Sequence, residues 1–169
     1  MSKKIAIIAT TGYEDLELHY PRLRLKEDGH QVEIIGVKMD RFQGKHGYPV
    51  KPDKEIDKAN PDDYDGVIIP GGVENPDKLR RYPKTIAFVA KLYHDKKLVA
   101  AICHGGWVLV SAKILEGRKA TSFFAIKDDM VNAGVEFVDK EVVVDGNLVT
   151  SRMPDDLPVF MKEVLKILD

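Results

Sequence analysis

Short, uninterrupted runs of apolar residues constrain the fold of this chain more than any other feature. They occupy residues 5–9, 67–69 and 98–102. An apolar run without polar alternation is typical of a strand buried on both faces, as in a parallel sheet. Residues 32–37 are predicted as a further strand. Residues 48–56, where alternation is looser and two prolines occur, are predicted as edge structure.

Helical patterns lie between these strands. The first pattern has four apolar residues at helical spacing among charged residues: Leu16, Tyr20, Leu23 and Leu25. Gly29 is expected to cap the end of that helix. Residues 84–94 show the same spacing, and residues 107–112 are expected to begin another helix directly after the strand at 98–102.

The last third of the chain differs from the rest. Apolar stretches at 142–144 and 148–150 flank Asp145, Gly146 and Asn147, which predicts an antiparallel hairpin. A final helix is expected after Pro154 or Pro158, with an inner face of Phe160, Val164, Leu165 and Leu168. The alternation of strands and helices predicts an α/β fold: a doubly wound, mostly parallel sheet flanked by helices, flavodoxin-like, with a small antiparallel hairpin.

Size and charge narrow the class of protein. A chain of 169 residues and 19.0 kDa has room for one domain, predicted as residues 1–169. Its 26 Lys and Arg against 27 Asp and Glu give a net charge of −1, so neither a nucleic acid nor a membrane partner is expected. The apolar run at 5–9 is too short for a signal peptide or a membrane span. Together with a single cysteine, this predicts a cytoplasmic location.

Ligands of an open parallel sheet bind beyond the carboxyl ends of its strands. Three loops are expected there, and they carry Glu14, the double glycine at 71–72, and Cys103 with His104. A thiol between a buried strand and a helix start faces the positive end of the helix dipole, which favours the thiolate. A lone cysteine is more often core filler, but the His and Gly pair that follows Cys103 favours a nucleophile at a tight turn.

The other residues of these loops each have two interpretations. Glu14 is either an ordinary charge at a helix start or the carboxyl partner of the thiol, with a pKa raised by burial. Gly71 and Gly72 either permit a tight turn or donate a backbone amide to an oxyanion, with a second amide from His104. Gly105 would let substrate approach the backbone.

These residues and their order resemble the PfpI-type intracellular proteases, the family of glyoxalase III and the deglycases, within the class I glutamine amidotransferase-like superfamily. The resemblance runs nearly end to end and covers residues 13–17, 44–48, 70–72, 101–105, 117–119, 127–129, 132–136, 150–152 and 154–157.

The resemblance implies that Cys103 is the nucleophile, with Glu14 as its carboxyl partner and His104 as the adjacent imidazole. It also implies an acid lent by a neighbouring subunit. Asp77 fits that place best and Glu74 is the weaker candidate, so a homo-oligomer, a dimer or a hexamer, is expected. One departure from the family pattern is a glycine at 106, where relatives commonly have proline.

Two other kinds of site are not expected. True glutamine amidotransferases of this superfamily use a His-x-Glu motif near the C-terminus, and none of the five histidines follows His104. The acidic pairs at 128–129 and 155–156 are interpreted as helix-start charges because no histidine clusters with them. Neither a metal nor a cofactor is therefore predicted.

Three functions fit these residues. The first is a cysteine peptidase or hydrolase in which the Cys103 thiolate attacks a carbonyl carbon. The second is a glutathione-independent glyoxalase or deglycase acting on methylglyoxal and its adducts. The third is a stress protein without enzymatic activity, an oxidant sensor or a chaperone, because an accessible thiolate oxidises readily.

Overall fold

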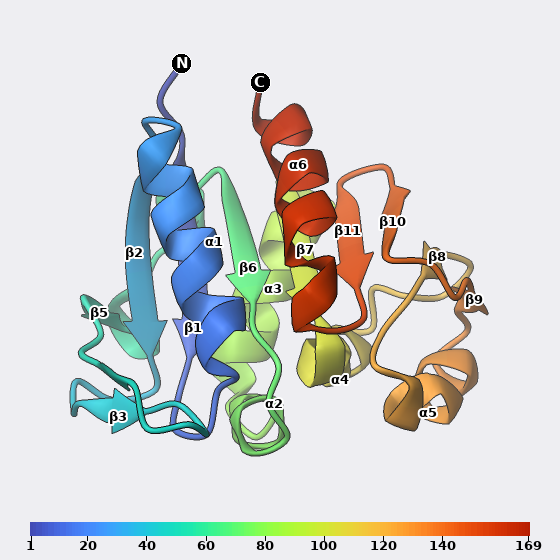
Figure 1. Cartoon of the computed structure of the whole chain (residues 1–169), viewed down its shortest axis with the longest axis horizontal. Helices are drawn as coiled ribbons and strands as arrows, with labels where there is room; N and C mark the ends of the chain where they lie inside the picture. The colour runs from blue at the N-terminus through green and yellow to red at the C-terminus, as the bar shows by residue number, and fades with distance from the viewer.

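A seven-stranded sheet forms the centre of the structure, a computed structural model of residues 1–169 (Figure 1). Its order is β10-β11-β7-β6-β1-β2-β5. The bounds are β1 Lys4–Ala9, β2 Gln31–Gly36, β5 Lys54–Glu55, β6 Gly66–Ile69, β7 Leu98–Ile102, β10 Val142–Asp145 and β11 Leu148–Ser151. All neighbours pair in parallel except β10 and β11, which form the expected hairpin. The predicted fold class is therefore confirmed.

Six α-helices and two small strand pairs complete the chain. The helices are α1 Asp15–Glu27, α2 Glu74–Leu79, α3 Pro83–His94, α4 Gly106–Ser111, α5 Lys127–Asn132 and α6 Leu157–Leu168. The small strands are β3 Phe42–Gln43 with β4 Pro49–Val50, and β8 Lys119–Ala120 with β9 Glu136–Phe137. None of the helices combines the length and apolarity needed to cross a bilayer.

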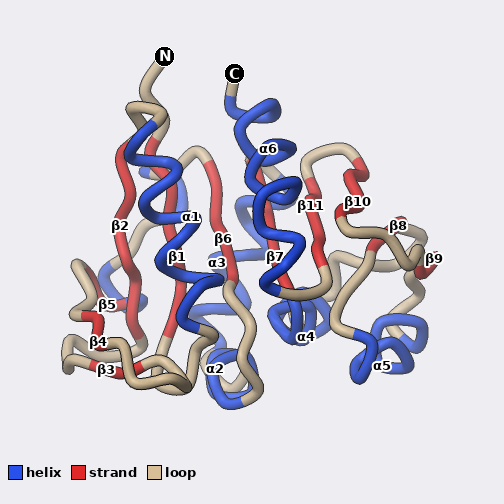
Figure 2. The backbone as a smooth tube through the Cα atoms, viewed as in Figure 1, coloured by secondary structure: helices blue, strands red, loops and turns tan.

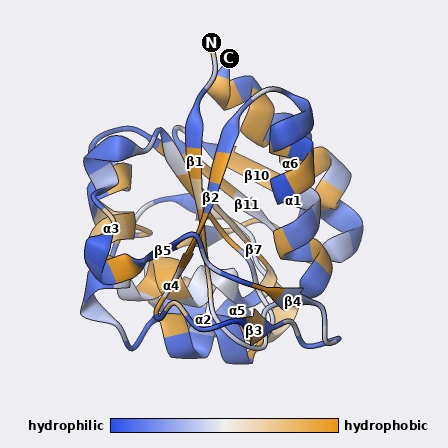
Figure 3. Ribbon diagram, turned by 90° about the vertical axis from the view of Figure 1, so that its left-hand side faces the viewer, coloured by the Kyte–Doolittle hydropathy of each residue, from blue (hydrophilic) through white to orange (hydrophobic).

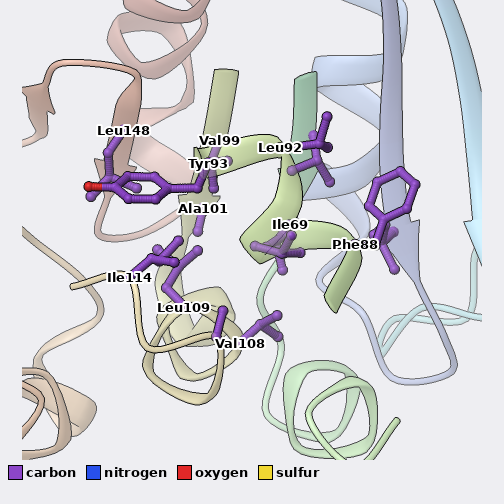
Figure 4. Packing of buried hydrophobic residues seen from close by; sticks show 14 of the residues in the cluster. Ile69, Phe88, Leu92, Tyr93, Val99, Ala101, Val108, Leu109, Ile114 and Leu148 are labelled. Carbon is purple, nitrogen blue, oxygen red and sulfur yellow. The ribbon is translucent and has the colours of Figure 1, made fainter. Parts of the chain in front are cut away.

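The apolar core lies in two layers, one on each face of the sheet. Alternate strand residues contact α1 and α6 on one face, and α3 and α4 on the other. On the second face Ile69 and Ala101 of the strands pack among Phe88 of α3 and Leu109 of α4 (Figure 4). Figure 3 shows the apolar strands enclosed between helices whose outer sides are hydrophilic. This two-sided burial is why the central strands lack polar alternation.

The apolar positions of α1 do not all face the sheet. Of the four that show helical spacing in the sequence, Leu16, Tyr20 and Leu23 are exposed and only Leu25 is buried. The residues of α1 that are buried against the sheet are Glu17, Leu18, Pro21 and Leu25. Gly29 ends the helix as predicted, with a left-handed φ of 86° and its N–H donating to the Lys26 carbonyl. The true inner face therefore includes a carboxyl group.

The carboxyl ends of β1, β6 and β7 meet at one edge of the sheet, at the bottom of Figure 1. The loops that leave them lead directly into α1, α2 and α4 (Figure 2). Residues far apart in the sequence are thereby brought together at this edge.

Candidate active site

Cys103 stands at the bend between β7 and a single 3-10 turn, Cys103–Gly105, that precedes α4. Its φ is +61°, a left-handed conformation that costs a residue with a side chain about 1 kcal/mol. The residue is 8% exposed. A strained bend at the end of a buried strand directs the thiol into the loops instead of the core, the position expected for a nucleophile.

Close backbone packing around the thiol requires glycine at two loop positions. A Cβ on Gly71 would lie 2.6 Å from the Cys103 Cβ and 3.0 Å from its Sγ. A Cβ on Gly72 would lie 2.2 Å from the Gly12 carbonyl oxygen, and Gly72 also has a φ of 77°. The double glycine thus allows the loop after β6 to lie directly against the cysteine.

The carboxyl group beside the sulfur belongs to Glu17. Glu17 is fully buried, its Oε2 accepts the Gly71 N–H at 2.7 Å, and its carboxyl lies close enough to the Cys103 thiol that each group shifts the pKa of the other. Glu14, the predicted partner, lines the same cleft but caps α1: its Oε2 accepts the N–H groups of Leu16 and Glu17. Because α1 begins at residue 15, position 14 points its carboxylate at the helix end, and the side chain one turn later reaches the thiol.

Burial raises the pKa of both members of the Cys103–Glu17 pair. Desolvation lifts the pKa of Glu17 from 4.5 to about 8, and the charge of Glu14 adds to the rise. Desolvation is also the largest cause that raises the pKa of Cys103, followed by the charge of Glu17. The helix start alone predicts the opposite direction for the thiol, so that expectation is wrong: loss of water outweighs the neighbouring amides. When Glu17 carries its proton, its repulsion of a thiolate disappears and it can donate a hydrogen bond to the sulfur.

His104 lies beside the thiol and is held by aromatic rings. Its Nδ1 is 3.3 Å from the Cys103 sulfur. The imidazole stacks on Phe123, with ring centres 5.0 Å apart, and meets the edge of Trp107 at 5.2 Å. Burial, with a smaller effect from Lys45, lowers the pKa of His104, which favours the neutral ring. A neutral imidazole can accept the thiol proton.

Backbone amides also face the sulfur. Hydrogen bonds from the N–H groups of His104 and Gly72 act to lower the pKa of Cys103. The Gly71 N–H, predicted as a further donor, is instead committed to Glu17. Gly105 serves close packing: its Cβ would lie 2.6 Å from the Ile69 carbonyl oxygen. The amides available at the sulfur are therefore those of residues 72 and 104.

Asn75, absent from the sequence prediction, ties the loops together. It is fully buried on α2, its Oδ1 accepts the Thr10 N–H at 2.7 Å, and its amide donates to the Pro70 and Gly71 carbonyls. It links the end of β1 to the double glycine. An asparagine six residues after the end of a strand has no sequence signal for this role, because the contact depends on the fold.

The thiol opens into a cleft of about 440 Å³. Its lining residues are Gly12, Glu14, Glu17, Lys45, Gly72, Val73, Glu74, Cys103, His104, Phe123 and Pro154. Glu74 is thus part of the cleft of its own chain. Asp77 is not: its half-exposed carboxylate pairs with Arg81, which lies just beyond the end of α2. The predicted role of Asp77 in a neighbouring subunit stays a prediction.

Two other features lack the chemistry of this cleft. A larger cavity of about 540 Å³ lies between α4 and α5, but no cysteine, serine, threonine or histidine lines it. Glu14, Asp15 and His46 each place one potential metal ligand within 4.8 Å of the others. However, both Asp15 oxygens already accept backbone N–H groups, and one Glu14 oxygen caps α1. Two free ligand atoms, from Glu14 and His46, are too few for a structural metal.

Fold and site together define a class: α/β proteins with a cysteine at the bend between a buried central strand and a helix. The profile of the DJ-1/PfpI family matches residues 3–167. The chain therefore belongs to the DJ-1/PfpI family, which confirms the resemblance found in the sequence.

Several named proteins are similar to this chain over nearly its full length. Deglycase PfpI of Pyrococcus furiosus is 48% identical over 165 residues, which cover 98% of this chain and 99% of its own. General stress protein 18 of Bacillus subtilis is 45% identical, with coverage of 100% and 99%. The "Putative cysteine protease YraA" of the same organism is 42% identical, with coverage of 99% and 99%.

Solved structures have the same fold. A two-domain protein of Anabaena variabilis with DJ-1/ThiJ/PfpI-like and ferritin-like domains matches with a TM-score of 0.97 and 43% identity. The match covers 99% of this chain and 48% of that one, so this chain spans about half of its length. DJ-1beta of Drosophila melanogaster matches with a TM-score of 0.91 and 28% identity, over 97% and 89% of the two chains.

Proposed function

We propose that this protein is a cysteine-dependent deglycase or glyoxalase, which converts methylglyoxal or its adducts to lactate without glutathione. The observation that carries the proposal is the contact of the Cys103 thiol with a carboxyl group whose pKa is raised to about 8, that of Glu17. Near neutral pH such a carboxyl is populated in both its protonated and its ionised form. It can therefore accept a proton in one step and donate a proton in another. Relatives 48% identical bear the name deglycase.

The first step joins the thiol to the substrate. The Cys103 sulfur adds to the aldehyde carbon of methylglyoxal, a C–S bond forms, and the C=O double bond opens to an oxyanion. The thiol proton passes to His104, whose Nδ1 is 3.3 Å away. The N–H groups of Gly72 and His104 stabilise the oxyanion before it takes up that proton. With an amine adduct, the sulfur displaces the amine and the same hemithioacetal results.

The second step is an internal transfer of hydrogen. Glu17, as carboxylate, removes the proton on the sulfur-bearing carbon while the ketone oxygen takes up a proton, which gives an enediol. The protonated Glu17 then gives a proton to the former ketone carbon, and the hydroxyl on the sulfur-bearing carbon loses its proton to become the thioester carbonyl. The product is a lactate thioester of Cys103. Water then adds to the thioester, the C–S bond breaks, and lactate and the free thiol are released. The sum is methylglyoxal plus water giving lactate.

A peptidase is the second candidate, because Cys103 and His104 are in contact and YraA carries a protease name. The same nucleophile would form an acyl-enzyme and release an amine. In that reaction a proton donor must reach the leaving nitrogen, and His104 is the available group. Cleavage of a fluorescent casein, lost in Cys103→Ser, would support the peptidase.

The stress-sensor alternative has weaker support from the site, although one relative is named a general stress protein. Oxidation requires a standing thiolate, and burial raises the pKa of Cys103. An enzyme avoids this requirement, because His104 can take the proton as the substrate is attacked.

Assembly and location complete the proposal. We place the protein in the cytoplasm as a homo-oligomer in which Asp77 of one subunit approaches the cleft of the next. Its outward position, away from its own cleft, is compatible with that arrangement.

Lactate formation from methylglyoxal, in buffer without glutathione, tests the proposed function. We expect turnover by the wild type and a loss of about 1,000-fold or more in Cys103→Ser. Glu17→Gln should lower turnover about 100-fold. Lys51→Met, an exposed change outside the cleft, is the control and should leave turnover unchanged. A Cys103→Ser variant that retains wild-type turnover would exclude the assigned nucleophile.

A further inference from the structure

Lys45 is the one lysine or arginine that lines the cleft, and it has no carboxylate partner. Of the acids beside it, Glu74 pairs with Lys78. Glu14 caps α1 through its Oε2, and its Oε1 lies 3.6 Å from His46 Nε2, an ion pair when His46 is protonated. Lys45 makes no ion pair, although its charge acts on both Glu17 and His104. The Lys45 ammonium thus lies at the cleft without a carboxylate partner and is free to bind an anion.

The loop that carries Lys45 is fixed at several points. The Lys45 N–H donates to the Tyr13 carbonyl at 2.8 Å. The two oxygens of the Asp15 carboxylate accept the N–H groups of His46 and Tyr48, each at 2.9 Å. A Cβ on Gly44 would lie 2.4 Å from the Asp15 carboxyl group, so only glycine allows the loop to lie this close. The backbone holds Lys45 in place, and its ammonium remains free.

The charges of the other cleft residues determine what Lys45 can bind. Burial favours the neutral form of both Glu17 and His104, the groups closest to the thiol. Since Glu74 is paired with Lys78 and Lys45 makes no ion pair, the Lys45 ammonium can bind an anionic group on a substrate without first leaving another partner. A lysine ammonium forms strong, charge-assisted hydrogen bonds with a carboxylate.

We propose that Lys45 is a specificity-determining residue that binds a carboxylate carried by the substrate. On the proposed function, the preferred substrates are methylglyoxal adducts of small molecules that bear a carboxylate, over neutral adducts of the same size. An adduct within a protein chain has no free carboxylate on the modified residue, so it would gain nothing from Lys45. This inference rests on the proposed function for the reaction, but the anion site itself can be tested without turnover.

Alkylation of Cys103 by iodoacetate and by iodoacetamide provides that test. The reagents are nearly equal in size and differ in charge, and each forms a C–S bond while iodide leaves and the thiol proton passes to buffer. Because the chain has one cysteine, intact mass gives both rates directly. We expect Lys45→Met to lower the iodoacetate to iodoacetamide rate ratio about fivefold, equivalent to about 1 kcal/mol. Lys45→Arg should keep the ratio within about twofold.

Lys51→Met is the matched control, since Lys51 is also exposed and unpaired but lies outside the cleft. High salt should reduce the wild-type ratio toward that of Lys45→Met. An unchanged ratio in Lys45→Met would overturn the proposal. An equal slowing of both reagents would also overturn it, because Lys45 would then act on ionisation of the thiol.

A second measurement separates this inference from the proposed function. The substrates are the methylglyoxal hemithioacetals of N-acetylcysteine and of its amide, which differ by one carboxylate. Lys45→Met should raise KM about fivefold for the first alone. If neither adduct reacts but the alkylation ratio falls, the proposed function fails and the anion site stands. If both react with the same KM in wild type and variant, the anion site fails and the function stands.

Discussion

The buried carboxyl of Glu17 should make the stability of this protein depend on pH. Its pKa is raised from 4.5 to about 8, mainly by burial. Between those values the folded state holds a proton that the unfolded chain has released. Stability is therefore fully present below pH 4.5 and falls as pH rises through 8. At about 1.4 kcal/mol for each pH unit, the loss is on the order of 5 kcal/mol.

Glu17→Gln removes this dependence, because an amide oxygen can still accept the Gly71 N–H but the side chain cannot ionise. Urea unfolding, followed by the fluorescence of the single tryptophan, gives the free energy of unfolding from pH 4.5 to 9. We expect the free energy of unfolding of Glu17→Gln to exceed that of wild type by an amount that grows by several kcal/mol between pH 4.5 and 8 and levels off above pH 8. Cys103→Ala should keep the pH dependence, since burial is its largest cause.

Glu27→Gln, on the same helix but exposed, controls for the loss of a carboxyl from α1. A free-energy difference between Glu17→Gln and wild type that stays constant over the whole pH range would refute the reasoning. The carboxyl would then be ionised in both the folded and the unfolded states, and it could not exchange protons with substrate near neutral pH.

Three further predictions address packing, assembly and a partly buried ion pair. Gly71→Ala should destabilise the fold by about 1–3 kcal/mol and reduce alkylation of the cysteine at least tenfold, because the new Cβ overlaps the thiol and Glu17; wild-type values in both assays would contradict the packing. Asp77→Asn should reduce turnover while light scattering shows unchanged assembly, and full activity in the assembled variant would exclude a role across subunits. Arg152→Met should cost about 2 kcal/mol in urea unfolding, because the Asp156 carboxylate, 4% exposed, would lose its guanidinium partner; a cost below about 0.5 kcal/mol would contradict this.

The strands and the position of the thiol were predictable from the sequence because they depend on local patterns. Continuous apolar runs identified β1, β6 and β7, and the abrupt change after residue 102 placed Cys103 at a bend. Topology then brought its loop beside those of Glu14 and the double glycine, and all three line one cleft. The short helix α2 was not predicted, since six residues carry too little periodicity, and α5 was indicated only by the acidic pair at 128–129, which lies in its first turn.

The identity of the carboxyl partner could not be read from the sequence. Helix α1 has apolar residues on two nearly opposite sides: the stripe of Leu16, Tyr20 and Leu23 lies about 180° around the helix from that of Leu18 and Leu25. Glu17 lies about 90° from both stripes, so the sequence alone does not tell whether its carboxyl faces the sheet or solvent. The direction of the thiol pKa shift was hidden for a different reason: it depends on how much water the folded loops exclude, which no local pattern records.

The left-handed backbone at residue 103 bears on how this protein could change over time. Glycine adopts that conformation without strain, so replacing Cys103 by glycine would stabilise the fold. A chain selected only for stability would therefore lose the thiol. Backbone strain at residue 103 therefore favours the loss of the cysteine during evolution. A cysteine is retained at this position only while the function of the protein depends on its thiol.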